Sequence, residues 1–462
     1  MRLLHTADWH LGRLLHRVPL LDAQRQVLDH LIDVARAERV DAIIVAGDLF
    51  DRALPPVEAV QLAGDALRRM AEVAPVIAIS GNHDSAQRLG FARELIAAGG
   101  VHLRTDPTGS GDPVVLEDEH GPVAIYGIPY LDPDLCRGPL EVDERSHDAV
   151  LRAATTLARG DLAGRAQTTG GSLRGVVVAH AFVHGGEPSE SERDISIGGA
   201  QTVSASVFDG FAYAALGHLH RPHAVGGGVR EAAPVPEEPE TTSTDEADHA
   251  EPLAVPDDAG TLSLFGALGD EVVAPRSAAP SSSSAASDPL DRSAIATIDP
   301  GASSPIRYAG SPLAYSFTEA DAEKTTAIVE IDGEGRTEVR LLPVPSPYRL
   351  VRLRGTLDEL LDDPALAEHE RDDHWLEVVL TDAQLPARPM ERLRRRFPRI
   401  LVLQHVPAGE LAAATVAAAR VQGRSDLEVL ERFVADVRGA EVDETERPLL
   451  QDAVEAVGRD RA

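Results

Sequence analysis

Five short apolar stretches in the first half of the chain each end in side chains that can bind a metal ion. In chain order, the polar residues that follow them are Asp8 and His10, then Asp48, then Asn82-His83-Asp84, then His180, and last His218 and His220. One Asp-x-His pair is more often surface polarity than a pair of ligands. Five such endings in a row are hard to explain as polar turns, and they indicate one shared site.

The donor types indicate divalent-metal chemistry. Carboxylate, amide oxygen and imidazole without thiolate suit Mn²⁺, Fe²⁺ or Zn²⁺ in an open site better than a structural zinc site. Even seven ligands from among these nine side chains would be too many for one catalytic ion, so the pattern predicts two. Asp48 is the natural bridge, because one carboxylate can span ions about 3.5–4 Å apart. Such a pair activates water for in-line attack on phosphorus, so we expect phosphoester hydrolysis.

Buried strands must position these groups. The apolar runs that predict strands are 2–6, 41–46, 76–80, 124–127, 175–179 and 213–216, and helical spacing marks 21–36 and 57–71. This alternation predicts an α/β fold. Ligands gather just past the carboxyl ends of strands in such folds, because the loops converge on one edge of the sheet.

The composition suits a globular protein of two or three domains. The chain has 462 residues, of which 43% are hydrophobic and 26% charged. One cysteine, Cys136, forms no internal disulfide and suits a reducing cytosol. No apolar run approaches the length of a membrane span, and His5 and Asp8 interrupt any signal-peptide core. We therefore expect a cytoplasmic protein without membrane contact.

The charge pattern bears on partners. A net charge of −31 argues against a protein that coats nucleic acid by charge alone. The sole lysine, Lys324, follows Glu323, so the Gly-Lys pair of a P-loop is absent and any ATP-driven step must belong to a partner. The clearest basic cluster contains Arg394 and Arg395, which form either a phosphate contact or a solvated helix face.

Composition also divides the chain. Residues 1–230 and 305–345 form the predicted first domain, and residues 231–304, rich in Pro, Ser, Ala and acid, predict a disordered insertion. Inside it, Thr261-Leu262-Ser263-Leu264-Phe265 is either a chance apolar patch or a peptide that docks on the sliding clamp, with Thr261 in place of the usual glutamine. Residues 346–408 predict a small α/β domain with strands near 348–353, 375–380 and 400–404. Residues 409–462 predict two amphipathic helices, for a core or for partner docking.

The motifs D-x-H, GD, GNHD, H and GHxH, in this order, resemble those of the calcineurin-like metallophosphoesterases. The stretches LHTADWHLG, DAIIVAGDLFD and ALGHLHR, with RDISIG and YAGSP, are similar to the SbcD subfamily of nuclease subunits. The resemblance covers residues 1–230 and 305–345 well and the C-terminal third more loosely. It implies a four-layer αββα sandwich, with residues 346–408 as a capping, DNA-gripping domain and terminal helices after it.

The resemblance also implies a role for each site residue. The first metal would be held by Asp8, His10, Asp48 and His220, and the second by Asp48, Asn82, His180 and His218. His83 would stabilise the transition state and protonate the leaving oxygen, and Asp84 would orient His83 or a neighbouring histidine. Arg52 and Arg221 would be phosphate contacts or else exposed loop charges. Asp51 stands where archaeal and eukaryotic relatives have a histidine, so it is expected to give support only.

The implied activity is that of a DNA nuclease, exonuclease and endonuclease, in repair and recombination. Its cofactors would be two divalent ions, foremost Mn²⁺, with Mg²⁺, Fe²⁺ or Zn²⁺ as substitutes. Its partner would be an SbcC-type coiled-coil ATPase that docks the terminal helices, and the chain would be a homodimer within a heterotetramer. Two alternatives stay open: a metallophosphoesterase for small phosphodiesters, and a non-catalytic scaffold subunit.

Overall fold

The computed structural model of the chain describes residues 1–169, 173–183, 202–225 and 305–407, together with Val434, Arg447 and Leu450. Described residues up to Val351 belong to one compact unit, and those from Arg352 onward to a second. The predicted insertion at 231–304, its stretch 261–265, the segment 193–198 and the terminal helices at 409–462 lie outside the described residues.

The first sheet supplies three of the five strand ends. Its order is β14-β13-β1-β4-β5-β6, in which β1, β4, β5 and β6 are parallel and β13 pairs antiparallel with both of its neighbours, β1 and β14. The strands are β1 (Arg2–Thr6), β4 (Ala42–Val45), β5 (Val76–Ile79), β6 (Val101–Arg104), β13 (Thr325–Ile331) and β14 (Thr337–Pro343). Every residue of β4 and β5 is buried, as expected for apolar strands covered on both faces.

The second sheet supplies the other two strand ends. Its order is β11-β12-β10-β9-β8-β7, with β8, β9, β10 and β12 parallel and β7 and β11 antiparallel at the edges. The strands are β7 (Val114–Asp118), β8 (Gly121–Ile128), β9 (Arg174–His180), β10 (Tyr213–Gly217), β11 (His223–Ala224) and β12 (Ile306–Tyr308). A segment that follows residue 304 thus completes the sheet beside β10.

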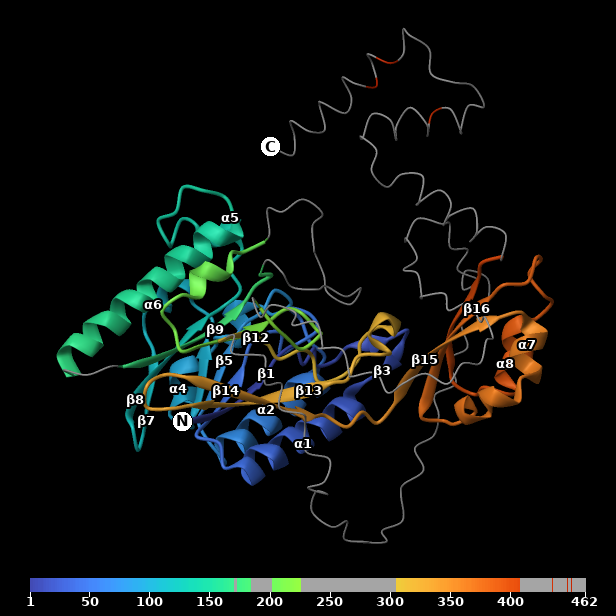
Figure 1. The fold of residues 1–462 in the computed structure, drawn as a ribbon, viewed down its shortest axis with the longest axis horizontal. Helices are drawn as coiled ribbons and strands as arrows, with labels where there is room; N and C mark the ends of the chain where they lie inside the picture. Colours follow the sequence, from blue (N-terminus) through green and yellow to red (C-terminus); the bar gives the residue numbers. More distant parts are fainter. Residues whose placement is uncertain are drawn as a thin grey trace, which may run out of the picture. The chain divides into compact units, whose positions relative to one another are not determined.

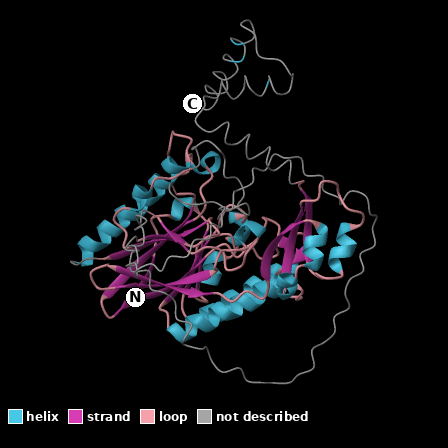
Figure 2. Cartoon of the chain, turned by 45° about the vertical axis from the view of Figure 1, so that its right-hand side comes forward, coloured by secondary structure: helices cyan, strands magenta, loops and turns pink. Residues whose placement is uncertain are grey.

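The two sheets pack face to face between layers of helices (Figures 1 and 2). Ile44 and Ile77 of the first sheet pack with Val176 and Val178 of the second in the core between them. Helices α1 (Leu21–Glu38) and α2 (Val57–Ala71) lie beside the first sheet, and α6 (His147–Thr169) packs on the outer face of the second. Short elements are the β2–β3 hairpin (Leu14–Leu15, Val18–Pro19), α3 (Ala86–Leu89), α4 (Arg93–Ala97) and α5 (Pro133–Cys136). The predicted α/β sandwich is confirmed.

The second unit is a small α/β domain. Its sheet has the order β15-β16-β17, and its strands are β15 (Arg349–Gly355), β16 (His374–Leu380) and β17 (Ile400–His405). Helices α7 (Leu357–Asp362) and α8 (Pro389–Arg394) lie on one side of this sheet (Figure 1). Thr356 and Glu359 start α7 with a capping box. The three strands predicted between residues 348 and 404 are confirmed.

Local pattern located the main elements to within a few residues. The predicted strands at 2–6, 41–46 and 76–80 and the helix at 57–71 match β1, β4, β5 and α2. In the described part of the chain, no helix is both long enough and apolar enough to cross a bilayer.

Candidate metal centre

The predicted ligands meet at the carboxyl ends of β1, β4, β5, β9 and β10. His180 Nε2 lies 3.4 Å from Asp48 Oδ2, and His180 Nδ1 lies 3.9 Å from Asp8 Oδ1. His10 Nε2 lies 3.7 Å from Asp48 Oδ2. These contacts join both sheets, because Asp8, His10 and Asp48 follow strands of the first and His180 ends a strand of the second. The side chains are almost fully buried.

The backbone at the site is held in conformations that most residues avoid. Asp8, His10, Asp48 and His218 have φ angles of 54°, 44°, 50° and 106°. Such angles cost free energy for residues other than glycine and persist where surrounding contacts impose them. The N–H groups of Asp8 and His10 donate to the carbonyls of Gly47 and Asp48, both at 3.0 Å, which locks the first two loops together.

Two glycines permit the close approach of these loops. A Cβ on Gly81 would lie 2.2 Å from Asp48 Oδ1, and one on Gly217 would lie 1.9 Å from the Ala46 carbonyl oxygen. Both distances are far below van der Waals contact, so any larger residue would push the loops apart. The β5 and β10 ends therefore depend on glycine to reach Asp48 and Ala46.

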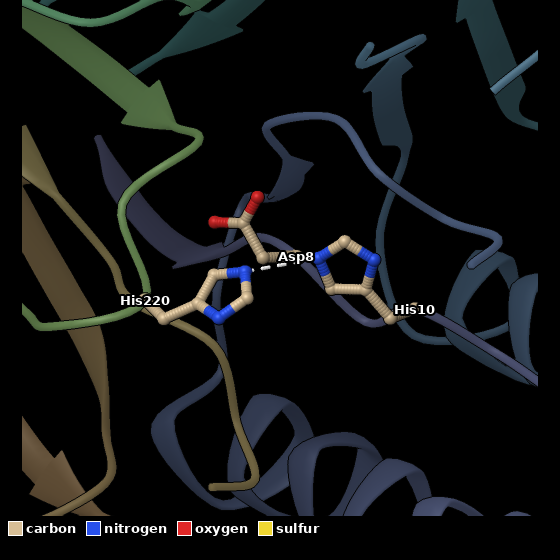
Figure 3. A group of neighbouring side chains, drawn as sticks. All are labelled: Asp8, His10 and His220. Carbon is tan, nitrogen blue, oxygen red and sulfur yellow. Dashed lines mark hydrogen bonds between the residues drawn. The ribbon is translucent and has the colours of Figure 1, made fainter. Parts of the chain in front are cut away.

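The first cluster of ligands consists of Asp8, His10 and His220 (Figure 3). His220 comes from the loop after β10, and the other two come from the loop after β1. The Nε2 atoms of the two imidazoles lie 3.0 Å apart, with the Asp8 carboxylate beside them. This is the ligand set expected for the first metal, apart from the bridging Asp48.

The second cluster surrounds Asn82. Its Oδ1 lies 2.9 Å from His180 Nε2 and 3.2 Å from His218 Nδ1. The Ala46 carbonyl accepts a hydrogen bond from the other ring nitrogen of His180, Nδ1, at 2.9 Å. When the ring is neutral, that bond keeps the proton on Nδ1, and Nε2 offers its lone pair on the side of the Asn82 oxygen and Asp48.

Burial, together with a few close charges, shifts the pKa values of the groups in the site. Burial raises the pKa of Asp8 to about 7 against the attraction of His180 and His220. Burial also disfavours the charged form of His180, but Asp48 and Asp8 raise its pKa to about 9. Burial lowers the pKa of His218 to about 3. The site thus retains protons where acceptor atoms face one another.

The donor set fits divalent cations. Imidazole nitrogens and carboxylate oxygens face one another here within 3–4 Å. Their lone pairs repel, so the arrangement is stable only when a proton or a cation lies between them. The combinations within ligand distance are Asp8-His10-His220, Asp8-Asp48-His180 and His10-Asp48-His83. Asp8, His10 and Asp48 each occur in two of them, as expected for two adjacent ions.

Metal affinity is expected to rise with pH between about 6 and 9. Asp8 and His180 have pKa values of about 7 and 9 without metal, so bound protons compete with the ions until pH exceeds those values. The apparent affinity should rise by roughly tenfold per pH unit for each proton displaced. Titration calorimetry with Mn²⁺ at several pH values, in buffers of different ionisation enthalpy, measures both quantities. An affinity independent of pH would contradict this proton count.

His83 has a partner that fixes its ring. Its Nδ1 donates to the Asp51 carbonyl at 2.8 Å, and its backbone N–H donates to Asp48 Oδ1 at 2.9 Å. The ring stands edge-on to His10, with centroids 4.6 Å apart. With Nδ1 used in this way, Nε2 is the nitrogen that can exchange a proton with a substrate.

Asp84 corrects one expectation. Its carboxylate was expected to orient an imidazole, but the hydrogen bonds that the structure gives it come from backbone amides. Oδ2 accepts from Gly81 at 3.0 Å and Leu49 at 3.1 Å, and Oδ1 accepts from Phe50 at 3.0 Å. Burial, with Asp48 nearby, raises its pKa to about 7 against these three donors. Asp84 therefore joins the β5 loop to the β4 loop, and it acts on the histidines only through the backbone.

Asp84→Ala is expected to destabilise the fold. Three backbone N–H groups would lose their acceptor, and each unsatisfied buried donor costs about 1–3 kcal/mol. Partial access of water reduces the sum, so we expect a loss of roughly 3 kcal/mol in unfolding free energy. Urea unfolding of the metal-free protein measures it, with the exposed Asp112→Ala as control. An unchanged unfolding midpoint would show that water replaces the carboxylate.

The four arginines predicted to contact phosphate each have an intramolecular partner. Arg221 Nη2 donates to the Thr318 carbonyl at 2.8 Å, and the half-exposed Arg52 lies 3.7 Å from Asp51. Arg394 and Arg395, in the second unit, donate to Ile400 O and Glu391 Oε1. Their contact with a substrate stays a prediction.

Sequence reasoning missed several residues that hold the site. Gln24 of α1 donates to the carbonyls of Trp9 and His10 at 3.1 and 2.7 Å and accepts from Gly12. The Tyr315 hydroxyl also donates to Trp9 O, and its ring packs against His10. Glu319 lies beside His220, and although burial opposes its charge, Lys324 and His220 hold its pKa below the usual range. The isolated lysine, which the sequence analysis used only to exclude a P-loop, could have drawn attention to this region.

Comparisons with known proteins cover both units. Residues 1–153 match the family model of the calcineurin-like phosphoesterases. Residues 347–438 match the SbcD_C family model, described as the type 5 capsule protein repressor C-terminal domain. Among solved structures, the chain is similar to the crystal structure of TT1561 from Thermus thermophilus, with 14% identity and a TM-score of 0.25 over 41% of this chain and 69% of that one. A score that low supports no conclusion about function.

Proposed function

The chain belongs to the calcineurin-like metallophosphoesterases and also carries an SbcD_C domain, and from this premise we propose that it is a metal-dependent DNA nuclease of the SbcD type. The observation that carries the proposal is the joining, in one chain, of the five-strand metal centre to that C-terminal domain. The centre supports phosphodiester hydrolysis, and the second domain favours DNA over a small ester.

The proposed division of labour follows the contacts. Asp8, His10 and His220 would hold one ion, and Asn82, His180 and His218 the other, with Asp48 between the two groups. When bound, the two ions, foremost Mn²⁺, would neutralise the phosphodiester and activate a water molecule for in-line attack. As the imidazolium, His83 would hold the scissile phosphate through Nε2–H and give that proton to the leaving oxygen, becoming the neutral ring whose remaining N–H stays on Asp51 O.

We propose an SbcC-type coiled-coil ATPase as the partner in a cytoplasmic repair complex. The match of residues 347–438 to SbcD_C supports this context. So does the sequence, in which the single lysine follows Glu323 and no P-loop can form. The net charge of −31 also suits a nuclease that relies on another subunit to hold DNA.

The test compares two substrates. Purified protein with Mn²⁺ is incubated with linear duplex DNA and, separately, with a chromogenic phosphodiester, each with and without the coiled-coil ATPase. We expect cleavage of both, with DNA cleavage stimulated by the partner and ATP. Turnover of the small ester alone, with the partner present, would indicate a small-substrate phosphodiesterase. No turnover of either, by protein that binds metal, would favour a scaffold subunit.

The expected homodimer is proposed to form through the first domain. Large apolar side chains are exposed near the start of α2, where Leu54 and Val57 are 63% and 66% exposed, and at α4, where Phe91 just before the helix and Leu95 within it are 80% and 79% exposed. Exposed apolar surface of this kind is typical of protein interfaces. Sedimentation velocity should find a dimer for the wild type and a monomer for a Phe91→Asp, Leu95→Asp variant that still binds metal. A monomeric wild type would refute the proposal.

A further inference from the structure

Lys324 is the sole lysine among the 44 basic residues of the chain, and it is buried. Arginine supplies every other fixed positive charge, including those on the surface. The one lysine stands at an interior position, which suits a compact ammonium group better than a planar guanidinium.

The contacts of Lys324 explain that preference. Its Nζ donates to Glu319 Oε2 at 2.5 Å, to the His220 carbonyl at 3.0 Å and to Ser311 Oγ at 3.0 Å. An ammonium has three protons, and these three acceptors use all of them. The wider, flat fork of arginine does not fit three acceptors that surround one point.

Glu319 connects this ammonium to the metal centre. It is fully buried, at the end of the 3₁₀ turn Phe317–Glu319. One carboxylate oxygen receives Lys324, and the other, Oε1, lies 3.6 Å from His220 Nδ1. The opposite nitrogen of that ring, Nε2, faces His10 across 3.0 Å. His220 is thus held between Glu319 on one side and the ligand cluster on the other.

We propose that Glu319 and Lys324 are a positioning pair for His220, and hence for the first metal. The negative charge of the carboxylate, 3.6 Å from Nδ1, favours the ring proton on that nitrogen, so that Nε2 presents its lone pair to the ion. The ammonium binds both the Glu319 carboxylate and the backbone carbonyl of His220. It therefore helps to fix the backbone of this histidine as well as its ring. A buried ion pair adds little net stability, so positioning is the better reason for its presence. The inference rests on the proposed two-metal site.

The test is Mn²⁺ binding to metal-free protein, measured by titration calorimetry. Glu319→Gln keeps the shape of the side chain and should weaken one of two bound ions by about 10- to 100-fold, leaving the other unchanged. Glu323→Gln, an exposed carboxylate next to Lys324 in sequence, is the matched control and should bind like the wild type. Lys324→Arg should weaken the binding of the same ion. Should Glu319→Gln unfold, the same titration is made on the double variant Glu319→Gln with Lys324→Met, which removes both charges of the pair.

A double-mutant cycle separates positioning from general loosening of the fold. If Glu319 acts through His220, adding Glu319→Gln to His220→Ala should change metal affinity no further. Wild-type affinities in Glu319→Gln, or losses that add in the cycle, would overturn the inference. A wild type that binds two ions but does not cleave DNA would refute only the proposed nuclease function.

Discussion

His83→Ala is expected to retain both metal ions and to lose phosphodiester cleavage by about 10²- to 10⁴-fold, the usual effect of removing a general acid. The reason is its geometry. His83 is anchored through Nδ1 to the Asp51 carbonyl, so Nε2 is the ring nitrogen assigned to proton transfer to the leaving oxygen. Elemental analysis of the purified variant and single-turnover cleavage of a duplex oligonucleotide measure the two quantities.

The control for this prediction is His120→Ala, which removes an exposed histidine from the turn between β7 and β8. It should match the wild type in both assays. His83 could instead be a metal ligand, because its ring nitrogen lies within 4.8 Å of ligand atoms of His10 and Asp48. Loss of an ion from His83→Ala would make His83 a ligand and leave the leaving oxygen without an assigned acid.

Asp48→Asn is expected to remove tight binding of both ions and, with it, measurable cleavage. Asparagine has the same shape, tolerates the φ of 50° at this position, and can still accept the N–H of His83. The variant therefore loses only the negative charge that lies between His10 and His180. A neutral amide does not bridge two cations, so we expect each affinity to fall by at least about 100-fold.

Unfolding of the metal-free protein provides the check on Asp48→Asn. Its fold should be preserved, and the exposed Asp33→Asn on α1 should leave metal binding unchanged. If Asp48→Asn still binds two ions at wild-type affinity, the bridge belongs to another carboxylate. Asp8 is then the next candidate for the bridging carboxylate, since one of its oxygens lies within 4.8 Å of ligand atoms of both Asp48 and His180.

Much of the site could be predicted because its residues follow a local rule. Each ligand stands at the end of a buried apolar strand or a few positions after it, and parallel strands bring such positions to one edge. His10 and His220 are 210 residues apart, yet their Nε2 atoms lie 3.0 Å from each other. The positions of the strand ends were enough to predict that the two histidines lie together, because the sheets determine where each loop begins.

The contacts that stabilise the ligands were not predictable in this way. Asp84 follows the same strand as His83, and its type is consistent with orienting an imidazole. Its actual partners are amides of Leu49 and Phe50 on another loop as well as Gly81 on its own. The donor that a carboxylate binds depends on how two loops pack together, and the sequence pattern of either loop does not show how they pack.

The sequence by itself determined the chemistry: which strand ends carry imidazole, amide and carboxylate, and that two cations and a phosphoester suit them. Only the tertiary structure decided the tautomers and the supports, such as Ala46 O on His180 and Glu319 with Lys324 beside His220. The physical reason is range. Residue type and strand register are encoded within a few positions, whereas a hydrogen bond between segments about a hundred residues apart exists only once both sheets have packed.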